Sequence, residues 1–155
     1  MRITFVCTGN TCRSVMAEAL FKHMIKGTVL EDIEVDSAGT AASPNFTIFG
    51  ELKEVFEENG MDVGNHVSKM INKEIMESSD YVLVMTSSHQ EAISNRFPEL
   101  RYKVKMLSEF AEDEIKDIED PIGRGKRAYE KTFKVIKGYI EKIVERLKNE
   151  FEENR

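Results

Sequence analysis

Cysteine, proline and long apolar runs are scarce in this chain of 155 residues. Its two cysteines, Cys7 and Cys12, are too few for the disulfide framework of a small secreted protein. Three prolines and nine glycines exclude a collagen-like or low-complexity chain. No apolar stretch approaches the ~20 residues that a membrane-spanning helix needs. These absences leave a globular domain as the expected architecture.

The chain also lacks an excess of basic residues. Its 28 acidic residues outnumber 22 Lys and Arg, which gives a formal net charge of −6. Nucleic-acid binders usually present a basic surface that displaces counterions from phosphates, so we expect no nucleic-acid partner. Met1 leads directly into an apolar run, without the pattern of a secretory signal peptide. We therefore expect a cytoplasmic protein with no membrane partner. We also expect it to be a monomer.

Short β-branched runs alternate with helical patterns along the chain. Strands are predicted at residues 3–6, 33–37, 81–85 and 103–107, and helices at 15–26, 48–58, 87–97 and 129–151. Such alternation is typical of βαβ units with right-handed crossovers. No linker or repeat divides the chain, so we predict a single three-layer α/β domain over residues 1–155. It should contain a four-stranded parallel sheet with helices on both faces.

The loop after the first predicted strand carries the strongest chemical signal. Residues 7–14 read CTGNTCRS and lead into a helix, whose first N–H groups lack partners and whose dipole adds positive potential. Gly9 and Asn10 tolerate positive φ, so the loop can curl its amides around a tetrahedral oxyanion. Arg13 can add a bidentate contact to two phosphate oxygens. The same field favours the thiolate of Cys7, which would be an in-line nucleophile beneath a bound phosphate.

Less specific interpretations of the loop residues compete with this one. A cysteine at the end of a buried strand is often an inert small hydrophobe. Cys7 and Cys12 could form half of a zinc site, but His23, His66 and His89 are scattered along the chain and no second cysteine pair exists. We therefore predict no metal and no cofactor, because Arg13 and the loop amides supply the positive charge that a phosphate needs.

The loop and several later segments together resemble the low-molecular-weight protein tyrosine phosphatases. The signature of that family is similar to residues 6–19, which read VCTGNTCRSVMAEA. Weaker matches follow in the family's order: DSAG at 36–39, NHVS at 65–68, SDYVLVM at 79–85 and DP at 120–121. The resemblance covers essentially the whole chain. It implies the family's fold, with a phosphate-binding loop after the first strand, and phosphorylated proteins as substrates.

The resemblance also implies catalytic roles for three residues. Cys7 would be the nucleophile that forms a phospho-cysteine intermediate, and Arg13 would clamp the phosphate and stabilise the transition state. Asp120 would protonate the leaving group and later activate water. From residue type alone, Asp120 is one of seven acids between Glu109 and Asp120, and a solvated acidic loop is the simpler interpretation of that stretch.

Supporting roles follow from the same resemblance. Asn10 would hold a left-handed backbone conformation through hydrogen bonds to Ser37 and His66. Ser14 would steady the thiolate, although it could also be the N-cap of a helix that starts at Val15. Cys12 would form a reversible disulfide with Cys7, which would shield the nucleophile from over-oxidation. The substrate-binding set implied for the loop is Thr8, Gly9, Asn10, Thr11, Cys12 and Ser14.

The substrate is less well determined than the chemistry. Tyrosine-directed members carry a larger aliphatic residue where this chain has Thr11, and aromatic residues where Ile122 and Gly123 follow Asp120-Pro121. The loop is more similar to the bacterial protein-arginine-phosphatase branch of the family. We therefore predict phosphoarginine as the substrate, with phosphotyrosine as the alternative.

The chain departs from the family at a few positions, and other classes of protein use similar loops. Val15 replaces the usual proline, and residues 40–42 supply no aromatic wall, for which Phe46 or Phe49 could substitute. A thioredoxin-coupled arsenate reductase would need cysteines after Cys12, and none follows. A phosphopeptide-binding module would have no use for the nucleophile Cys7. Both classes are less favoured than a phosphatase.

Overall fold

A computed structural model describes residues 1–154 of the chain. The strands β1 (Arg2–Cys7), β2 (Glu34–Gly39), β3 (Tyr81–Val84) and β4 (Val104–Met106) form one sheet in the order β2-β1-β3-β4. Every neighbouring pair of strands is parallel. The predicted four-stranded parallel sheet is confirmed, and each strand lies within two residues of its predicted bounds.

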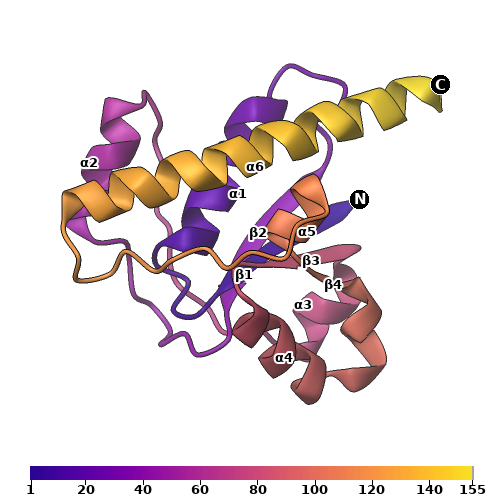
Figure 1. Ribbon diagram of the computed structural model, residues 1–155, viewed down its shortest axis with the longest axis horizontal. Helices are drawn as coiled ribbons and strands as arrows, with labels where there is room; N and C mark the ends of the chain where they lie inside the picture. Colours follow the sequence, from indigo (N-terminus) through magenta and orange to yellow (C-terminus); the bar gives the residue numbers. More distant parts are fainter. Residues whose placement is uncertain (155) are drawn as a thin grey trace.

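Helices connect the strands on both faces of the sheet (Figure 1). They are α1 (Arg13–Ile25), α2 (Gly50–Glu58), α3 (Lys73–Ser78), α4 (Ser87–Arg96), α5 (Leu107–Glu112) and α6 (Lys126–Glu153), with a 3-10 helix η1 (Pro98–Lys103). The four predicted helices correspond to α1, α2, α4 and α6. The short elements α3, η1 and α5 were not predicted, and α5 occupies the start of the stretch that was expected to be an acidic loop.

Two separate cores cover the two faces of the sheet. Successive side chains of a strand point to opposite faces, so Phe5 packs into the core formed with α1, α2, α5 and α6, whereas Val6 packs into the core formed with α3 and α4. Figure 1 shows the long α6 lying across α1, with α3 and α4 on the other side of the sheet. Strands buried on both faces explain the continuous apolar sequences of β1 and β3.

The topology places the end of β1 where ligands bind in such sheets. The chain adds β2 on one side of β1 and then β3 on the other, so the order of strands reverses at the carboxyl end of β1. The loop after β2 lies against the loop after β1, because Thr40 N donates to Cys7 O (2.9 Å) and Ala41 N donates to Thr8 O (3.0 Å). The segment before α6 also reaches this edge through Ile118 N and Met85 O (3.0 Å). Cys7 therefore lies where three connecting segments meet.

Gly39 permits the close approach of the first two of these segments. A Cβ at this position would lie 2.4 Å from the carbonyl oxygen of Thr8 and 2.9 Å from the Cβ of Ala42. We expect Gly39→Ala to lower the free energy of unfolding by about 1–3 kcal/mol, because the loop backbone would have to move. Urea denaturation measures this change.

Gly138→Ala is the matched control for that substitution. A Cβ at Gly138, inside α6, would meet nothing within 4 Å. It should raise the free energy of unfolding by about 0.5–1 kcal/mol through helix propensity. Equal effects of the two substitutions would contradict the close contact at Gly39.

Within residues 1–154, no helix has the length and apolar character that crossing a membrane requires.

Candidate active site

The loop between β1 and α1 is deeply buried except at its rim. Cys7 and Arg13 are 3% and 5% exposed, whereas Thr8 is exposed beside Cys7. Asn10 adopts the left-handed conformation (φ 55°) that the sequence predicts for this loop. Gly9, which could also have done so, does not have a positive φ. One left-handed residue is therefore enough to turn the loop into α1.

The side chain and carbonyl of Asn10 hold this turn in place. Its amide group donates to Ser14 Oγ and Ser37 Oγ, both at 2.9 Å, and its Oδ1 accepts from Lys69 N (3.1 Å). Its backbone oxygen accepts from His66 Nε2 at 2.7 Å. The contacts to Ser37 and His66 are those that the sequence resemblance implies. Because Asn10 is completely buried, each of these bonds satisfies a polar group that water cannot reach.

The direction of these hydrogen bonds points a donor at Cys7. Since Ser14 Oγ accepts from Asn10, its own hydrogen is free to reach Cys7 Sγ, 3.1 Å away. A hydroxyl that donates to sulfur stabilises the thiolate over the thiol. The alternative interpretation of Ser14 as an N-cap is wrong, because α1 begins at Arg13 and its N-cap position is Cys12.

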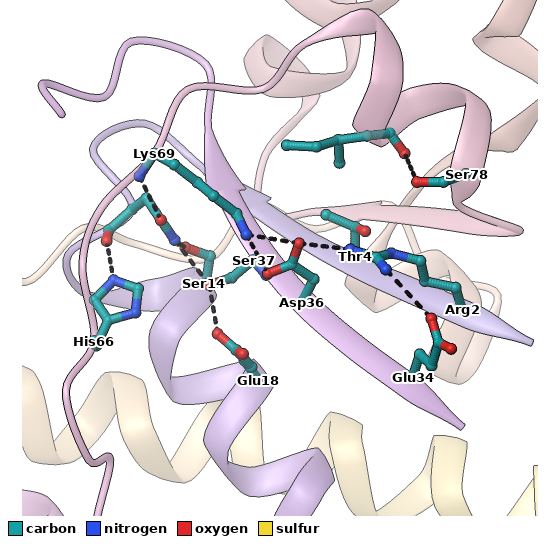
Figure 2. Close-up of polar contacts among 12 residues, drawn as sticks. Arg2, Thr4, Ser14, Glu18, Glu34, Asp36, Ser37, His66, Lys69 and Ser78 are labelled. Atoms are coloured by element: carbon teal, nitrogen blue, oxygen red, sulfur yellow. Dashed lines mark hydrogen bonds and ion pairs between the residues drawn. The ribbon is translucent and has the colours of Figure 1, made fainter. Parts of the chain in front are cut away.

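The same network continues from Ser37 to charged side chains, as Figure 2 shows. Ser37 Oγ donates to Glu18 Oε1 at 2.6 Å, and Glu18 is paired with Lys22. Next to Ser37, Asp36 accepts from Lys69 and Arg2. Burial alone would raise the pKa of Asp36, but the hydrogen bond and charge of Lys69, with the charge of Arg2, lower it below its usual value. These ion pairs tie β2 to the start of β1 and to Lys69, whose backbone supports Asn10.

Cys12 differs from Cys7 although both are buried free cysteines. Burial raises the pKa of Cys12 far above the ordinary value, and the charges of Cys7 and Asp120 raise it further, against the opposing effect of Arg13. Cys12 is therefore a neutral thiol. Of the two cysteines, Cys7 has the hydroxyl donor and the position at the end of β1.

Arg13 joins this loop to the segment that carries Asp120. Its Nη1 donates to the carbonyl of Ile118 at 2.9 Å, and its Nη2 lies 3.5 Å from Asp120 Oδ2. Ile118 is buried, while its acidic neighbours are exposed, so it anchors an otherwise solvated segment. Asp120 has a side chain that is 42% exposed, and its Oδ1 accepts from Ile122 N (3.1 Å). The structure thus places Cys7, Arg13 and Asp120 at one end of the sheet.

His89, one of the three histidines that are scattered along the sequence, is a neighbour of this site. It lies on the first turn of α4, is 5% exposed, and its Nε2 is 2.8 Å from Thr8 Oγ1. Burial and the nearby charge of Arg13 lower the pKa of His89 to about 4, against opposing contributions from Asp117 and Asp120. His89 is therefore neutral at physiological pH. Nothing in the local sequence, only the adjacency of β1 and β3, brings it to the loop.

No cluster of three or more His, Cys, Asp or Glu side chains suited to a metal ion occurs within residues 1–154. The chemistry available to the described residues is that of a nucleophilic sulfur, an anion-binding loop with a guanidinium, and a carboxyl group on the solvent side.

Known proteins that are similar to this chain over nearly its whole length are phosphatases. The protein-arginine-phosphatase of Bacillus subtilis is 39% identical over 150 residues, which are 97% of this chain and 99% of that protein. The solved structure of the YwlE arginine phosphatase from Geobacillus stearothermophilus superposes with a TM-score of 0.93 at 36% identity, covering 99% of this chain and 97% of that chain.

A further solved structure is a cysteine-to-serine variant of the YwlE arginine phosphatase with a phosphorylated active-site serine. It superposes with a TM-score of 0.90 at 39% identity, and the match covers 96% of each chain. Residues 2–153 match the family described as low molecular weight phosphotyrosine protein phosphatase. The chain belongs to this family.

Proposed function

We propose that this chain is a cysteine-dependent protein-arginine phosphatase, with Cys7 as nucleophile, Arg13 as phosphate clamp and Asp120 as general acid and base. The observation that carries the proposal is the arrangement at the end of β1: Cys7 Sγ lies 3.1 Å from a serine hydroxyl in an anion-binding loop, and the Arg13 guanidinium of that loop lies 3.5 Å from the Asp120 carboxyl group. We further propose that residues 1–155 act as a single cytoplasmic domain and as a monomer.

The first step transfers the phosphoryl group to sulfur. The Cys7 thiolate attacks phosphorus, an S–P bond forms, and the P–N bond to the substrate breaks. Asp120 gives its proton to the departing nitrogen. Arg13 and the loop amides, from Thr8 to Ser14, bind the phosphoryl oxygens whose charge changes in the transition state. Because Arg13 is held by the Ile118 carbonyl, its fork is positioned before substrate binds.

The second step returns the enzyme to its starting state. Asp120, now a carboxylate, removes a proton from water, the water oxygen attacks phosphorus, and the S–P bond breaks. The products are inorganic phosphate and the Cys7 thiolate, which Ser14 Oγ stabilises as a leaving group. Charge, protons and electron pairs balance over the two steps without a metal or a redox partner.

Phosphoarginine is favoured as substrate by the residue types at positions 11, 122 and 123 and by the relatives. Thr11 presents a hydroxyl and little bulk, which suits a planar guanidinium better than an aliphatic side chain does. Ile122 and Gly123 follow Asp120-Pro121 and offer no aromatic walls for a phenyl ring. The relatives named above are arginine phosphatases. Phosphotyrosine remains the second candidate, because the family description names it.

Substitution of Thr11 tests this choice of substrate. We expect the wild type to hydrolyse phosphoarginine peptides with higher kcat/KM than phosphotyrosine peptides. Thr11→Ile should shift that ratio toward phosphotyrosine by about 10- to 200-fold, the range that one pocket contact can supply. Steady-state release of phosphate from paired peptides with the same flanking sequence measures the ratio.

Thr11→Ser is the matched control for this experiment. It keeps the hydroxyl and should keep the preference for phosphoarginine. A wild type that prefers phosphotyrosine would refute the arginine assignment and leave the family assignment intact.

A further inference from the structure

We propose that His89 is a positioning residue that fixes the Thr8 hydroxyl as a hydrogen-bond donor at the mouth of the active site. The inference deepens the proposed function and rests on it. Thr8 follows the nucleophile directly and is exposed, and His89 Nε2 lies 2.8 Å from its Oγ1. A nearly fully buried ring on α4 thus makes its contact with a side chain that substrate will meet.

The other ring nitrogen determines the direction of this hydrogen bond. Within residues 1–154, His89 Nδ1 is buried and has no hydrogen-bond partner. A proton on Nδ1 would leave a buried donor unpaired and is disfavoured, so the neutral ring carries its proton on Nε2. His89 therefore donates to Thr8 Oγ1, and the hydroxyl accepts.

This direction of the hydrogen bond determines where the hydroxyl hydrogen of Thr8 points. Because Oγ1 accepts from His89, the hydroxyl hydrogen cannot point at the ring and is turned toward the open side of the loop. Thr8 is exposed and follows Cys7 directly, so on that side the hydrogen is accessible to a phosphorylated side chain that approaches Cys7. An acceptor of the substrate, either a phosphoryl oxygen or a peptide carbonyl beside the phosphorylated residue, would take this hydrogen. A freely rotating threonine would have to be ordered each time substrate binds.

The surroundings keep His89 in this one state. Arg13 on α1, with Asp117 and Asp120 on the segment before α6, are the charged groups that face it. Burial and Arg13 disfavour a cationic ring, so His89 remains a single donor across the neutral pH range. Its own backbone N–H is capped by Thr86 Oγ1 at 3.2 Å, which fixes the start of α4.

The same helix start also contacts the acid segment. Ser87 N donates to Asp117 Oδ1 at 2.8 Å, a short distance along the chain from Asp120. The first turn of α4 therefore supports the rim of the phosphate loop through His89 and the acid segment through Ser87. The ring of His89 thus makes a hydrogen bond to the loop that an apolar side chain in its place could not make.

A double-mutant cycle tests the inference. His89→Leu and Thr8→Val should each raise KM for a phosphoarginine peptide by about three- to tenfold, with a smaller change in kcat, because one oriented hydrogen bond is lost. The double variant should be no worse than the worse single variant. Thr8→Ser, which keeps the hydroxyl, should lose less than Thr8→Val, and His89→Gln, which keeps an N–H donor, should recover part of the loss.

Two further measurements identify which substrate atom accepts the Thr8 hydrogen and show whether each variant is folded. If the inhibition constant of inorganic phosphate rises with the peptide KM, the acceptor is a phosphoryl oxygen; if only the peptide KM rises, it is a peptide carbonyl. Thermal melting shows whether each variant folds. If His89→Leu does not fold, His89→Gln takes its place in the double-mutant cycle. Multiplicative losses in the double variant would overturn the proposal.

The proposal and the phosphatase function fail in different ways. A wild type without turnover of any phosphorylated substrate would refute the function. Nitrogen-15 NMR of the histidine rings would still test the contact, since Nε2 should be the protonated nitrogen of His89 and its shift should change in Thr8→Val. A proton on Nδ1 would overturn the inference whatever the activity.

Discussion

Cys7→Ser is expected to lose at least about 10⁴-fold in turnover of para-nitrophenyl phosphate while it still binds inorganic phosphate. The loop favours an anion at position 7 through the Ser14 hydroxyl, 3.1 Å from Sγ, and through the unpaired amides at the start of α1. A serine hydroxyl is a much weaker acid and a poorer nucleophile than a thiol, so the variant lacks a competent nucleophile. The amides and Arg13 remain, so anion binding persists. Steady-state kinetics and phosphate titration by calorimetry measure the two properties.

Cys12→Ser is the control that separates the nucleophile from its neighbour. Cys12 is a buried neutral thiol in the same loop, so the variant should lose far less activity, about tenfold at most from altered packing. Equal losses in the two variants would contradict the assignment of Cys7. Absence of turnover in the wild type itself would favour the phosphopeptide-binding module.

The sheet and the long helices could be predicted from the sequence because their patterns are local. β3 is apolar throughout, and the apolar positions of α6 recur every three or four residues, so burial and period agree. The short helix α3 gives no such signal, since six residues cannot show a period. Its C-terminal end is stabilised by a side chain that is distant in the sequence, because Lys103 Nζ donates to the carbonyls of Met76 and Glu77.

The residues of the candidate site also divide into those that the local sequence predicts and those that it does not. Cys7, Asn10 and Arg13 are close in sequence, and their residue types alone predict an anion-binding loop with a nucleophile. Asp120 could be chosen among its acidic neighbours only through the family resemblance, because the link to Arg13 spans 107 residues and runs partly through the backbone of Ile118.

His89 was missed as a neighbour of the loop for a related reason. Its contact with Thr8 depends on two strands lying side by side, and on the first turn of the helix that follows β3. A sequence pattern reports neither the order of strands in a sheet nor which loops meet at its edge. Family resemblance transfers the residues of the signature, and pairs outside it emerge only from the fold.

Asp120→Asn should reduce kcat on a phosphoarginine peptide by about 10²- to 10⁴-fold, the contribution of a positioned general acid. The size of this reduction in kcat should depend on how basic the leaving group is. A free guanidine is a very strong base and must leave with a proton, a tyrosine phenolate is a weaker base, and para-nitrophenolate is weaker still. The reduction should therefore be largest for the arginine peptide, intermediate for a tyrosine peptide, and smallest for para-nitrophenyl phosphate. Initial rates on the three substrates measure it.

Glu119→Gln is the matched control, since it makes the same acid-to-amide change one residue away on a side chain that is 68% exposed and paired with Arg124. It should change all three rates by less than about twofold.

The comparison also separates two functions of Asp120, which lies 3.5 Å from Arg13. If Asp120 served mainly to hold the guanidinium in place, its loss would impair phosphate binding and lower all three rates alike. Only a proton donor makes the penalty follow the basicity of the departing atom, so a uniform loss would remove Asp120 from the proton transfer and leave it as a support for Arg13.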